Sequence, residues 1–158
     1  LKARGTGGHV RRCHGDLHLR NICLLDGQPV LFDCIEFNDA FADIDVLYDL
    51  SFLLMDLRFQ GFEAAAFTVL AEYVSHTREE DGLVLLPLFQ SLRAAIRAHV
   101  SVSIAQSLKG GDREKLLEEA QAYLDWALAI LKPAQVWLTA VGGLSGSGTT
   151  TLALQTAE

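Results

Sequence analysis

The chain has no lysine or arginine between Asn21 and Leu57. The same stretch carries eight acidic side chains: Asp26, Asp33, Glu36, Asp39, Asp43, Asp45, Asp49 and Asp56. Some of these are expected to be surface groups or helix caps. Asp33 is different, because it follows Val-Leu-Phe in what the pattern predicts to be a buried strand, where an unpaired carboxylate is costly. A bound divalent cation would offset that cost.

Other absences narrow the function classes. The net charge of −7 argues against a nucleic-acid-binding surface as the main role. No apolar run approaches a membrane span, and no signal peptide or internal repeat is visible. The three cysteines, Cys13, Cys23 and Cys34, form no C-x-x-C pair. Their odd number and apolar neighbours predict reduced, buried thiols in a cytoplasmic protein.

The chain begins at Leu1, has its only methionine at Met55, and stops in an expected helix. We therefore expect a piece of a longer protein. Its 158 residues, half of them apolar, can bury one core and part of a second. The character of the sequence changes at Pro133, which predicts a first domain over 1–132 and the start of another over 133–158.

The predicted fold is mostly helical, of the α/β (α+β) class. Apolar periodicity predicts helices over 44–59, 62–77, 85–108 and 113–131, the first of them buried on nearly all sides. Residues 1–12 are predicted to be a loop or the frayed remnant of a preceding element, and 135–141 a strand. The basic side chains of the third helix, Arg93, Arg97 and His99, are expected mainly to be solvated.

Residues 14–33, HGDLHLRNICLLDGQPVLFD, hold the densest set of candidate functional residues. Two strand-forming runs flank the turn sequence DGQP, which predicts an antiparallel hairpin. That pairing places Asn21 opposite the residues around Asp33, with Asp16 at the mouth of the hairpin. Two carboxylates and an amide oxygen converge there, and such hard oxygen ligands suit magnesium with phosphate.

The pattern His14-Gly15-Asp16, Asn21 and Phe32-Asp33 resembles the catalytic core of the protein-kinase-like fold, and in detail the aminoglycoside phosphotransferase family. The resemblance covers about 9–132, the C-terminal lobe of such an enzyme, with a catalytic-loop hairpin. It implies ATP- and Mg²⁺-dependent phosphoryl transfer to a small hydroxyl-bearing substrate. By this resemblance Asp16 is the catalytic base, and Asn21 and Asp33 are magnesium ligands. His14, grouped with the catalytic residues, shapes the loop.

Several expectations qualify this resemblance. Such a kinase also needs an N-terminal lobe that residues 1–13 cannot supply, so we expect the isolated chain to be inactive or weak. Glu36 is expected to be a loop carboxylate, although it could reach the metal's waters or the substrate. Asp45 and Asp49 are expected to brace the catalytic loop by accepting backbone N–H bonds.

A second motif follows the predicted strand after Pro133. It fits the phosphate-binding loop G-x-x-x-x-G-K-[ST], except that Thr149 stands where lysine belongs. Backbone N–H groups there could still form an anion nest, and Thr150 matches the magnesium-binding hydroxyl. The candidate nucleotide-binding residues are Gly143, Ser145, Gly146, Ser147, Gly148, Thr149 and Thr150. A kinase-like lobe before a P-loop domain resembles bifunctional aminoglycoside phosphotransferase/ATP-binding proteins.

Three alternatives stay open at this stage. The first motif could be a surface loop with a fortuitous His-Gly-Asp, or the chain could be a non-catalytic remnant that binds a nucleotide or a partner. His14, Asp16 and His18 alternate, so on an extended strand they could hold zinc in a metal hydrolase. The second motif could be a glycine-rich turn that binds nothing.

Overall fold

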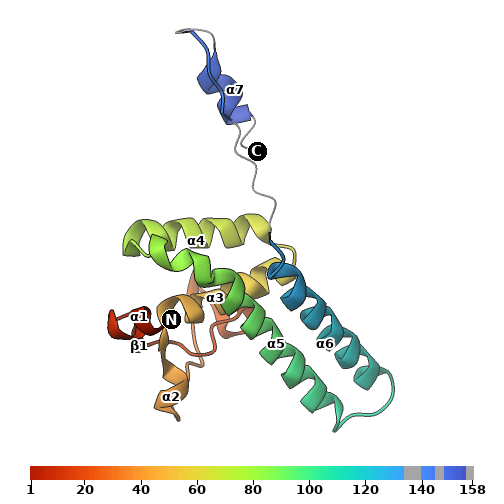
Figure 1. Cartoon of the computed structure of the whole chain (residues 1–158). Coiled ribbons are helices and arrows are strands. Elements are labelled where there is room, and N and C mark those ends of the chain that lie inside the picture. Colours follow the sequence, from red (N-terminus) through yellow and green to blue (C-terminus); the bar gives the residue numbers. More distant parts are fainter. Residues whose placement is uncertain (134–139, 145–147, 156–158) are drawn as a thin grey trace.

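The structure, a computed structural model, describes residues 1–133, 140–144 and 148–155. It is a mostly helical α+β fold with two small antiparallel sheets, as the sequence predicts (Figure 1). In chain order the elements are α1 (Lys2–Thr6), β1 (Val10–Arg12), η1 (Leu19–Asn21), β2 (Ile22–Leu25), β3 (Gln28–Leu31), α2 (Asp39–Ala42), β4 (Asp43–Asp45), α3 (Val46–Phe59), α4 (Glu63–Thr77), η2 (Glu80–Leu85), α5 (Leu86–Ala105), α6 (Gly111–Ile130) and α7 (Thr149–Gln155).

Helix α3 is the centre of the core. It packs against α4 and α5, and α5 lies beside α6 (Figure 1). One apolar cluster joins Leu47 and Leu54 of α3 to Phe89 of α5, and a second joins Met55 of α3 to Tyr123 of α6. The buried side chains of α3 point toward these two clusters. The helix is therefore apolar on nearly all sides, as predicted. The four helices predicted from periodicity are present, with ends shifted by up to three residues.

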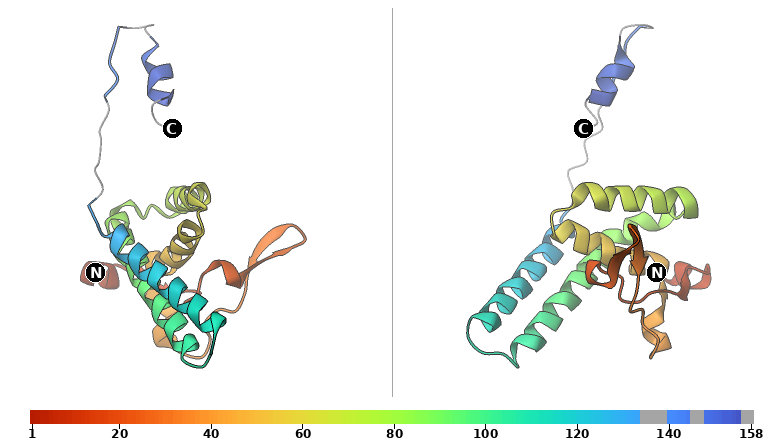
Figure 2. Two further views of the ribbon diagram at one scale, coloured as in Figure 1. Left: turned by 90° about the vertical axis from the view of Figure 1, so that its right-hand side faces the viewer. Right: turned by 180° about the vertical axis from the view of Figure 1, so that it is seen from behind.

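The β2–β3 hairpin projects from the helical body (Figure 2). Asp26 and Gly27 form its two-residue turn with φ values of 52° and 77°, the left-handed pair that a type I′ turn requires. Ile22 pairs with Leu31, and the Phe32 N–H donates to the Asn21 carbonyl at 3.1 Å. The predicted pairing of Asn21 with the residues beside Asp33 is therefore confirmed.

The prediction that Asp33 follows a buried strand is wrong. All four residues of β3 are exposed, as are Phe32 and Asp33 itself, because the hairpin extends away from the helices that form the core. The cysteines differ from the prediction as well. All three are free thiols, but Cys23 and Cys34 are exposed on and beside this hairpin, and Cys13 is half-buried.

Residues 1–12 form helix α1 and strand β1, so of the two alternatives predicted for this segment the loop is wrong. Strand β1 pairs antiparallel with β4. Arg4 of α1 reaches across to two acidic groups, donating from Nε to Asp45 at 2.6 Å and from Nη1 to Glu79 at 2.9 Å. Glu79 also lies 2.8 Å from His9 Nδ1. These long-range ion pairs, invisible to local periodicity, anchor the N-terminal segment.

The Arg4 cluster predicts a pH-dependent stability. Burial raises the pKa of Asp45 and of Glu79, but hydrogen bonds from Arg4 and from neighbouring groups outweigh it, so both pKa values are lowered. Carboxyl groups with lowered pKa stabilise the fold above their ordinary values of 3.8 and 4.5, and this stabilisation is lost as the pH falls through the lowered values.

We therefore expect Arg4→Met to lower the free energy of unfolding by about 3 kcal/mol or more at pH 7. Urea titrations at pH 7, 5 and 3 measure it. The difference between Arg4→Met and wild type should shrink at pH 3, where the carboxylates are increasingly protonated. A difference that is the same at all three pH values would contradict this account of the cluster.

We predicted that no apolar run approaches a membrane span. One stretch contradicts this by its length and composition. Residues Glu80–Ala105, which include α5, contain an 18-residue window with a mean hydropathy of 1.2 and are long enough to cross a membrane. However, α5 packs between α3 and α6 and buries Gln90, Arg93 and Ser101. This is the pattern of a core helix, and we assign it as one.

The segment after Pro133 is described only in part. The predicted strand over 135–141 falls largely on residues 134–139, outside the described residues. Helix α7 begins at Thr149, where the sequence predicts a helix to follow the second motif. Gly148, just before it, has a φ of 81°, a conformation that favours glycine.

Candidate active site

Helix α3 holds the loop that carries Asp16. The carboxylate of Asp49 accepts the backbone N–H groups of His14 at 3.0 Å and of Gly15 at 2.9 Å. Two helical turns later, Asp56 accepts the backbone N–H of Leu19 at 2.9 Å. Because residues seven apart share one helix face, α3 presents both carboxylates to the same loop. The loop-bracing prediction for Asp49 is confirmed, and Asp56 is an anchor that the sequence reading missed.

Asp45 does not brace the loop, so that part of the prediction is wrong. It caps α3 by accepting the Leu47 N–H at 2.9 Å, and it pairs with Arg4. Its position one residue before the helix explains the first contact, since a carboxylate there meets the free N–H groups of the first turn.

Gly15 allows the loop to pass close to its neighbours. Its φ of +83° lies in the left-handed region, and a Cβ there would stand 2.9 Å from both the Phe41 carbonyl oxygen and the Ile35 side chain. A side chain at this position would therefore push the loop away from residues 35–41. The glycine of the His-Gly-Asp motif is required by this geometry.

Asp16 lies at the centre of a small polar cluster. Asn21 Nδ2 donates to the Asp16 carbonyl at 2.9 Å and to Asp16 Oδ2 at 3.1 Å. This orientation of the Asn21 amide leaves Oδ1 as its ligand atom. His18 accepts the Arg20 N–H through Nδ1, so its proton resides on Nε2, which lies 3.3 Å from Asp16 Oδ2. Two donors thus fix the Asp16 carboxylate in one orientation.

The same contacts affect the charge of Asp16. The His18 contact lowers the pKa of Asp16, partial burial opposes it, and Asn21 and the positive charge of Arg93 lower it further. The net pKa is below its ordinary value, so the carboxylate is ionised at neutral pH. An ionised and oriented carboxylate can accept a hydrogen bond from a hydroxyl group. His18 is a positioning residue that the sequence reading treated only as a loop residue or a zinc ligand.

His14 connects the loop to the end of the hairpin. Its Nε2 donates to the Phe32 carbonyl at 2.9 Å, and its own carbonyl accepts the Ile35 N–H at 2.9 Å. Both bonds flank Asp33, whose φ of 58° turns the chain sharply after the hairpin. His14 therefore sets where Asp33 lies relative to the Asp16 loop.

Two cavities meet at Asp16. The first, of about 500 Å³, is lined by Asp16, Asp33 and Glu36 with their neighbours from Cys34 to Phe37. The second, of about 480 Å³, lies on the α3 and α5 side and has apolar and aromatic walls. Asp16 lines both cavities, whereas Asp33 and Glu36 line only the first. Glu36 is thus a loop carboxylate on the wall of the acidic cavity.

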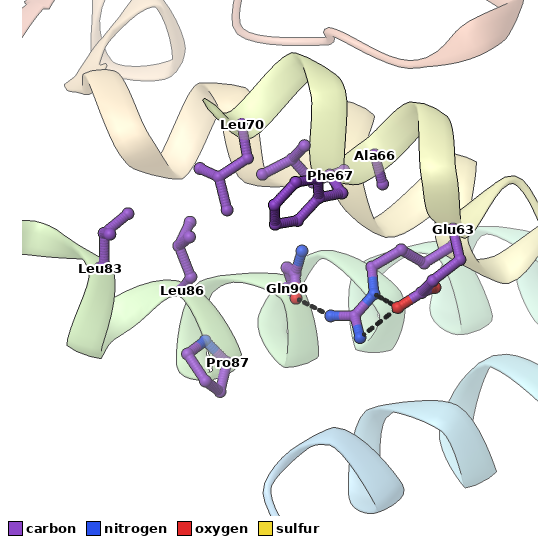
Figure 3. A pocket seen from close by; sticks show the side chains of 10 residues that line it. Glu63, Ala66, Phe67, Leu70, Leu83, Leu86, Pro87 and Gln90 are labelled. Carbon is purple, nitrogen blue, oxygen red and sulfur yellow. Dashed lines mark hydrogen bonds and ion pairs between the residues drawn. The ribbon is translucent and has the colours of Figure 1, made fainter. Parts of the chain in front are cut away.

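Another cavity, of about 410 Å³, lies among α3, α4, η2 and α5 (Figure 3). Leu70, Phe67, Leu83 and Leu86 form much of its wall, and Arg58, held by Glu63 and Gln90, lines it too. It shares no lining residue with the two cavities at Asp16. Its walls carry no arrangement of reactive groups comparable to that around Asp16.

The zinc hydrolase alternative does not fit the loop. His14 points its Nε2 to the Phe32 carbonyl, whereas His18 turns its Nε2 to Asp16 and packs its ring against Phe52. Across the part of the chain that the structure describes, no three His, Cys, Asp or Glu side chains are grouped closely enough to hold a metal ion. The loop is not the extended strand that this alternative assumed.

The expectation that Arg93 is solvated is wrong. The side chain is 7% exposed and stacks on two aromatic rings of α3, with its Cζ 4.0 Å from the centroid of Tyr48 and 4.8 Å from that of Phe52. These aromatic faces come from a helix more than forty residues earlier in the chain. A periodicity analysis of α5 alone could not detect them.

The residues of the second motif are described incompletely. Gly143, Gly148, Thr149 and Thr150 lie within the described residues, with Thr149 and Thr150 opening α7. Ser145, Gly146 and Ser147 lie outside them. The structure therefore describes the start of the helix but only the two ends of the loop before it.

Comparison with known proteins places this site in a family. The model of the Phosphotransferase enzyme family (APH) matches residues 1–83, more than half of the 158 residues. The chain belongs to this phosphotransferase family. The match includes the Asp16 loop, the hairpin and α3, and it ends within η2. The whole α5 wall of the second cavity lies beyond it, including Arg93.

Relatives of this phosphotransferase chain occur in mycobacteria. The uncharacterized proteins Rv2004c of Mycobacterium tuberculosis and Mb2027c of Mycobacterium bovis are each 35% identical to it over 146 residues. The match covers 92% of this chain but 28% of each relative, so the chain spans little more than a quarter of their length. No solved structure matches the chain.

Proposed function

We propose that this chain carries the catalytic loop of an ATP- and Mg²⁺-dependent phosphotransferase that acts on a small hydroxyl-bearing substrate. The observation that most supports this proposal is that Asp16 contacts Asn21, lines one cavity together with Asp33, and also lines a second cavity. A base that transfers a proton at the junction of two binding sites needs this arrangement. Membership of the phosphotransferase family supports the reaction class.

Asp33, which lines the first cavity, and Asn21, which contacts Asp16 beside it, suit magnesium. They would hold the ion, because carboxylate and amide oxygens are its preferred protein ligands and phosphate oxygens complete its shell. Bound Mg²⁺ would neutralise charge on the phosphates of ATP. The exposed position of Asp33 fits this role, since it leaves the carboxylate open to a ligand that comes from solvent.

The proposed step is an in-line transfer. The substrate oxygen forms a bond to the γ-phosphorus, the bond from that phosphorus to the bridging oxygen breaks, and ADP leaves with the electron pair. Asp16 takes the proton of the substrate hydroxyl. His18 and Asn21 hold the Asp16 carboxylate in place, and His14 holds the Asp33 segment beside it.

Removal of the Asp33 charge tests this proposal. Asp33→Asn keeps a residue that tolerates the left-handed backbone but lacks the charged ligand. We expect magnesium-dependent binding of ATP, measured by calorimetry with and without Mg²⁺, to weaken at least about tenfold. The matched control is Asp26→Asn, which removes one charge from the turn of the same hairpin at another left-handed position.

The control should bind like wild type. If Mg²⁺ strengthens ATP binding equally in wild type and in Asp33→Asn, Asp33 is not a ligand and the proposed site is wrong. If neither protein binds ATP at all, the chain is better explained as a non-catalytic remnant.

We also propose how the chain is divided into domains. Residues 1–132 would be the C-terminal lobe of the kinase-like unit, and 133–158 would begin a P-loop domain, as in bifunctional phosphotransferase/ATP-binding proteins. The start of α7 at Thr149 supports it. Within such a protein we place the reaction in the cytoplasm, and we expect the isolated chain to be weakly active or inactive.

A further inference from the structure

The residues that line the second cavity at Asp16 do not suit a polycationic sugar as the substrate of this phosphotransferase site. Its basic lining residues are Arg93 and Arg97, and Asp16 is its acidic one. The rest of the wall is apolar, aromatic or glycine. Tyr48 and Phe52 of α3 and Ile96 and Val100 of α5 form one part of it, and residues from the Gly15 loop and from 35–44 form the other. Two arginines in the wall of one cavity disfavour a cationic ligand and favour an anionic one.

Arg93 has an unfilled hydrogen-bonding capacity. Its Nε donates to the Tyr48 carbonyl at 3.3 Å, but its Nη2, although buried, has no hydrogen-bond partner. A buried charged donor without a partner is costly and calls for an explanation. The side chain is more than nine-tenths buried and lines the cavity, so an anionic ligand there is the group that would pair with it.

The nearest carboxylate does not remove this need. Asp49 Oδ1 lies 3.9 Å from Arg93 Nη2, which is too far for a hydrogen bond. Both oxygens of Asp49 already accept backbone N–H groups of the catalytic loop, from His14 and Gly15. Asp49 therefore compensates the charge of Arg93 at a distance and leaves the donor itself available.

The aromatic stack fixes Arg93 in place. With its guanidinium held over Tyr48 and Phe52, the side chain cannot swing out to solvent without losing both contacts. A guanidinium that is held in place recognises carboxylate or phosphate oxygens with little loss of conformational entropy on binding. An arginine with a purely structural role would be expected to donate all its N–H groups to acceptors within the protein.

We propose that the phosphoryl acceptor is an anionic hydroxy compound with an apolar portion. Its carboxylate or phosphate group pairs with Arg93, its apolar portion lies against Phe52, Ile96 and Val100, and its hydroxyl reaches Asp16. This inference rests on the proposed phosphotransferase function and names the substrate class of that same site. The cavity, at about 480 Å³, is large enough for a ligand with a single ring.

Matched probes test the charge preference without requiring turnover. 4-(Hydroxymethyl)benzoate, (4-(hydroxymethyl)phenyl)phosphonate, 4-(hydroxymethyl)benzylamine and 4-methylbenzyl alcohol share one ring and one hydroxyl, but carry a carboxylate, a phosphonate, an ammonium or no charge. We expect both anionic probes to bind at least about tenfold more tightly than the ammonium probe, as measured by ligand-observed NMR titration. The stronger of the two anions indicates whether a carboxylate or a phosphate is the natural group.

Arg93→Met keeps an unbranched apolar stem but removes the guanidinium and its charge. We expect it to abolish the preference for anionic probes while affecting the neutral probe less than about threefold. Arg113→Met, at an exposed position in the first turn of α6, is the matched control and should keep the wild-type preference. Arg93→Lys should keep a reduced preference, because lysine retains the charge without the planar donor pair.

The outcomes distinguish the proposed substrate class from the proposed phosphotransferase function. Equal binding of anionic and ammonium probes by wild type would overturn the substrate class, even if Arg93→Met fails to fold. A loss of affinity for all four probes alike in Arg93→Met would show a structural role and would also overturn it. Magnesium-dependent ATP binding, sensitive to Asp33→Asn, is read in a separate titration and reports on the proposed function alone.

Discussion

Asp16→Asn should lower kcat for phosphoryl transfer by about 10²- to 10⁴-fold, the contribution typical of a positioned general base. Asparagine can still accept from His18 and Asn21 through its amide oxygen, so the loop should keep its geometry. It cannot take the proton of the substrate hydroxyl. The measurement is ADP release in a protein that contains this chain together with the rest of the kinase unit.

Magnesium-dependent ATP binding provides the internal control for Asp16→Asn. It should stay within about threefold of wild type, since the proposed ligands are Asn21 and Asp33. Glu36→Gln is the matched variant, because Glu36 lines the same acidic cavity without contacting the base in the structure. We expect it to retain most of the wild-type rate. Unchanged turnover in Asp16→Asn would contradict the role of the base.

Asp49→Ala should produce the largest loss of stability among the site variants. It leaves the backbone N–H groups of His14 and Gly15 without their acceptor, and it removes the carboxylate that faces Arg93. Two charge-assisted hydrogen bonds and one buried charge together predict a loss of about 3–5 kcal/mol in the free energy of unfolding. Denaturant titration followed by circular dichroism measures it.

Asp49→Asn should fall between wild type and Asp49→Ala, because the amide keeps one acceptor oxygen for the loop. The control is Asp43→Ala, an exposed carboxylate a few residues earlier in the chain. We expect the control to change stability by no more than about 0.5 kcal/mol. If Asp49→Ala were as stable as Asp43→Ala, the catalytic loop would not depend on α3 in the way described above.

The features that could be predicted from the sequence depend on local patterns. The Asp26–Gly27 turn determines the register of the hairpin, because a type I′ turn aligns the strands on either side. The long helices follow from apolar periodicity. Asp49 was predicted, together with Asp45, to brace the loop by accepting backbone N–H groups, and for Asp49 this is confirmed.

The features that could not be predicted depend on contacts between distant segments. Helix α1 has five residues and no apolar repeat, and it is anchored by Arg4 reaching Asp45 and Glu79. Arg93 is buried because the rings of Tyr48 and Phe52 meet it across the helix interface. The exposure of β3 follows from where the hairpin extends, which the composition of the strand cannot reveal.

Binding of manganese with ATP tests the central claim most directly. Mn²⁺ replaces Mg²⁺ and broadens the NMR signals of nearby nuclei, so it reports where the metal lies in the ¹⁵N-labelled chain. The account predicts that the strongest broadening in the presence of ATP falls on the amides of Asp16, Asn21, Asp33 and their neighbours. It also predicts that Asp33→Asn removes this broadening. Unaffected signals at these three residues, with broadening centred elsewhere in the chain, would contradict it.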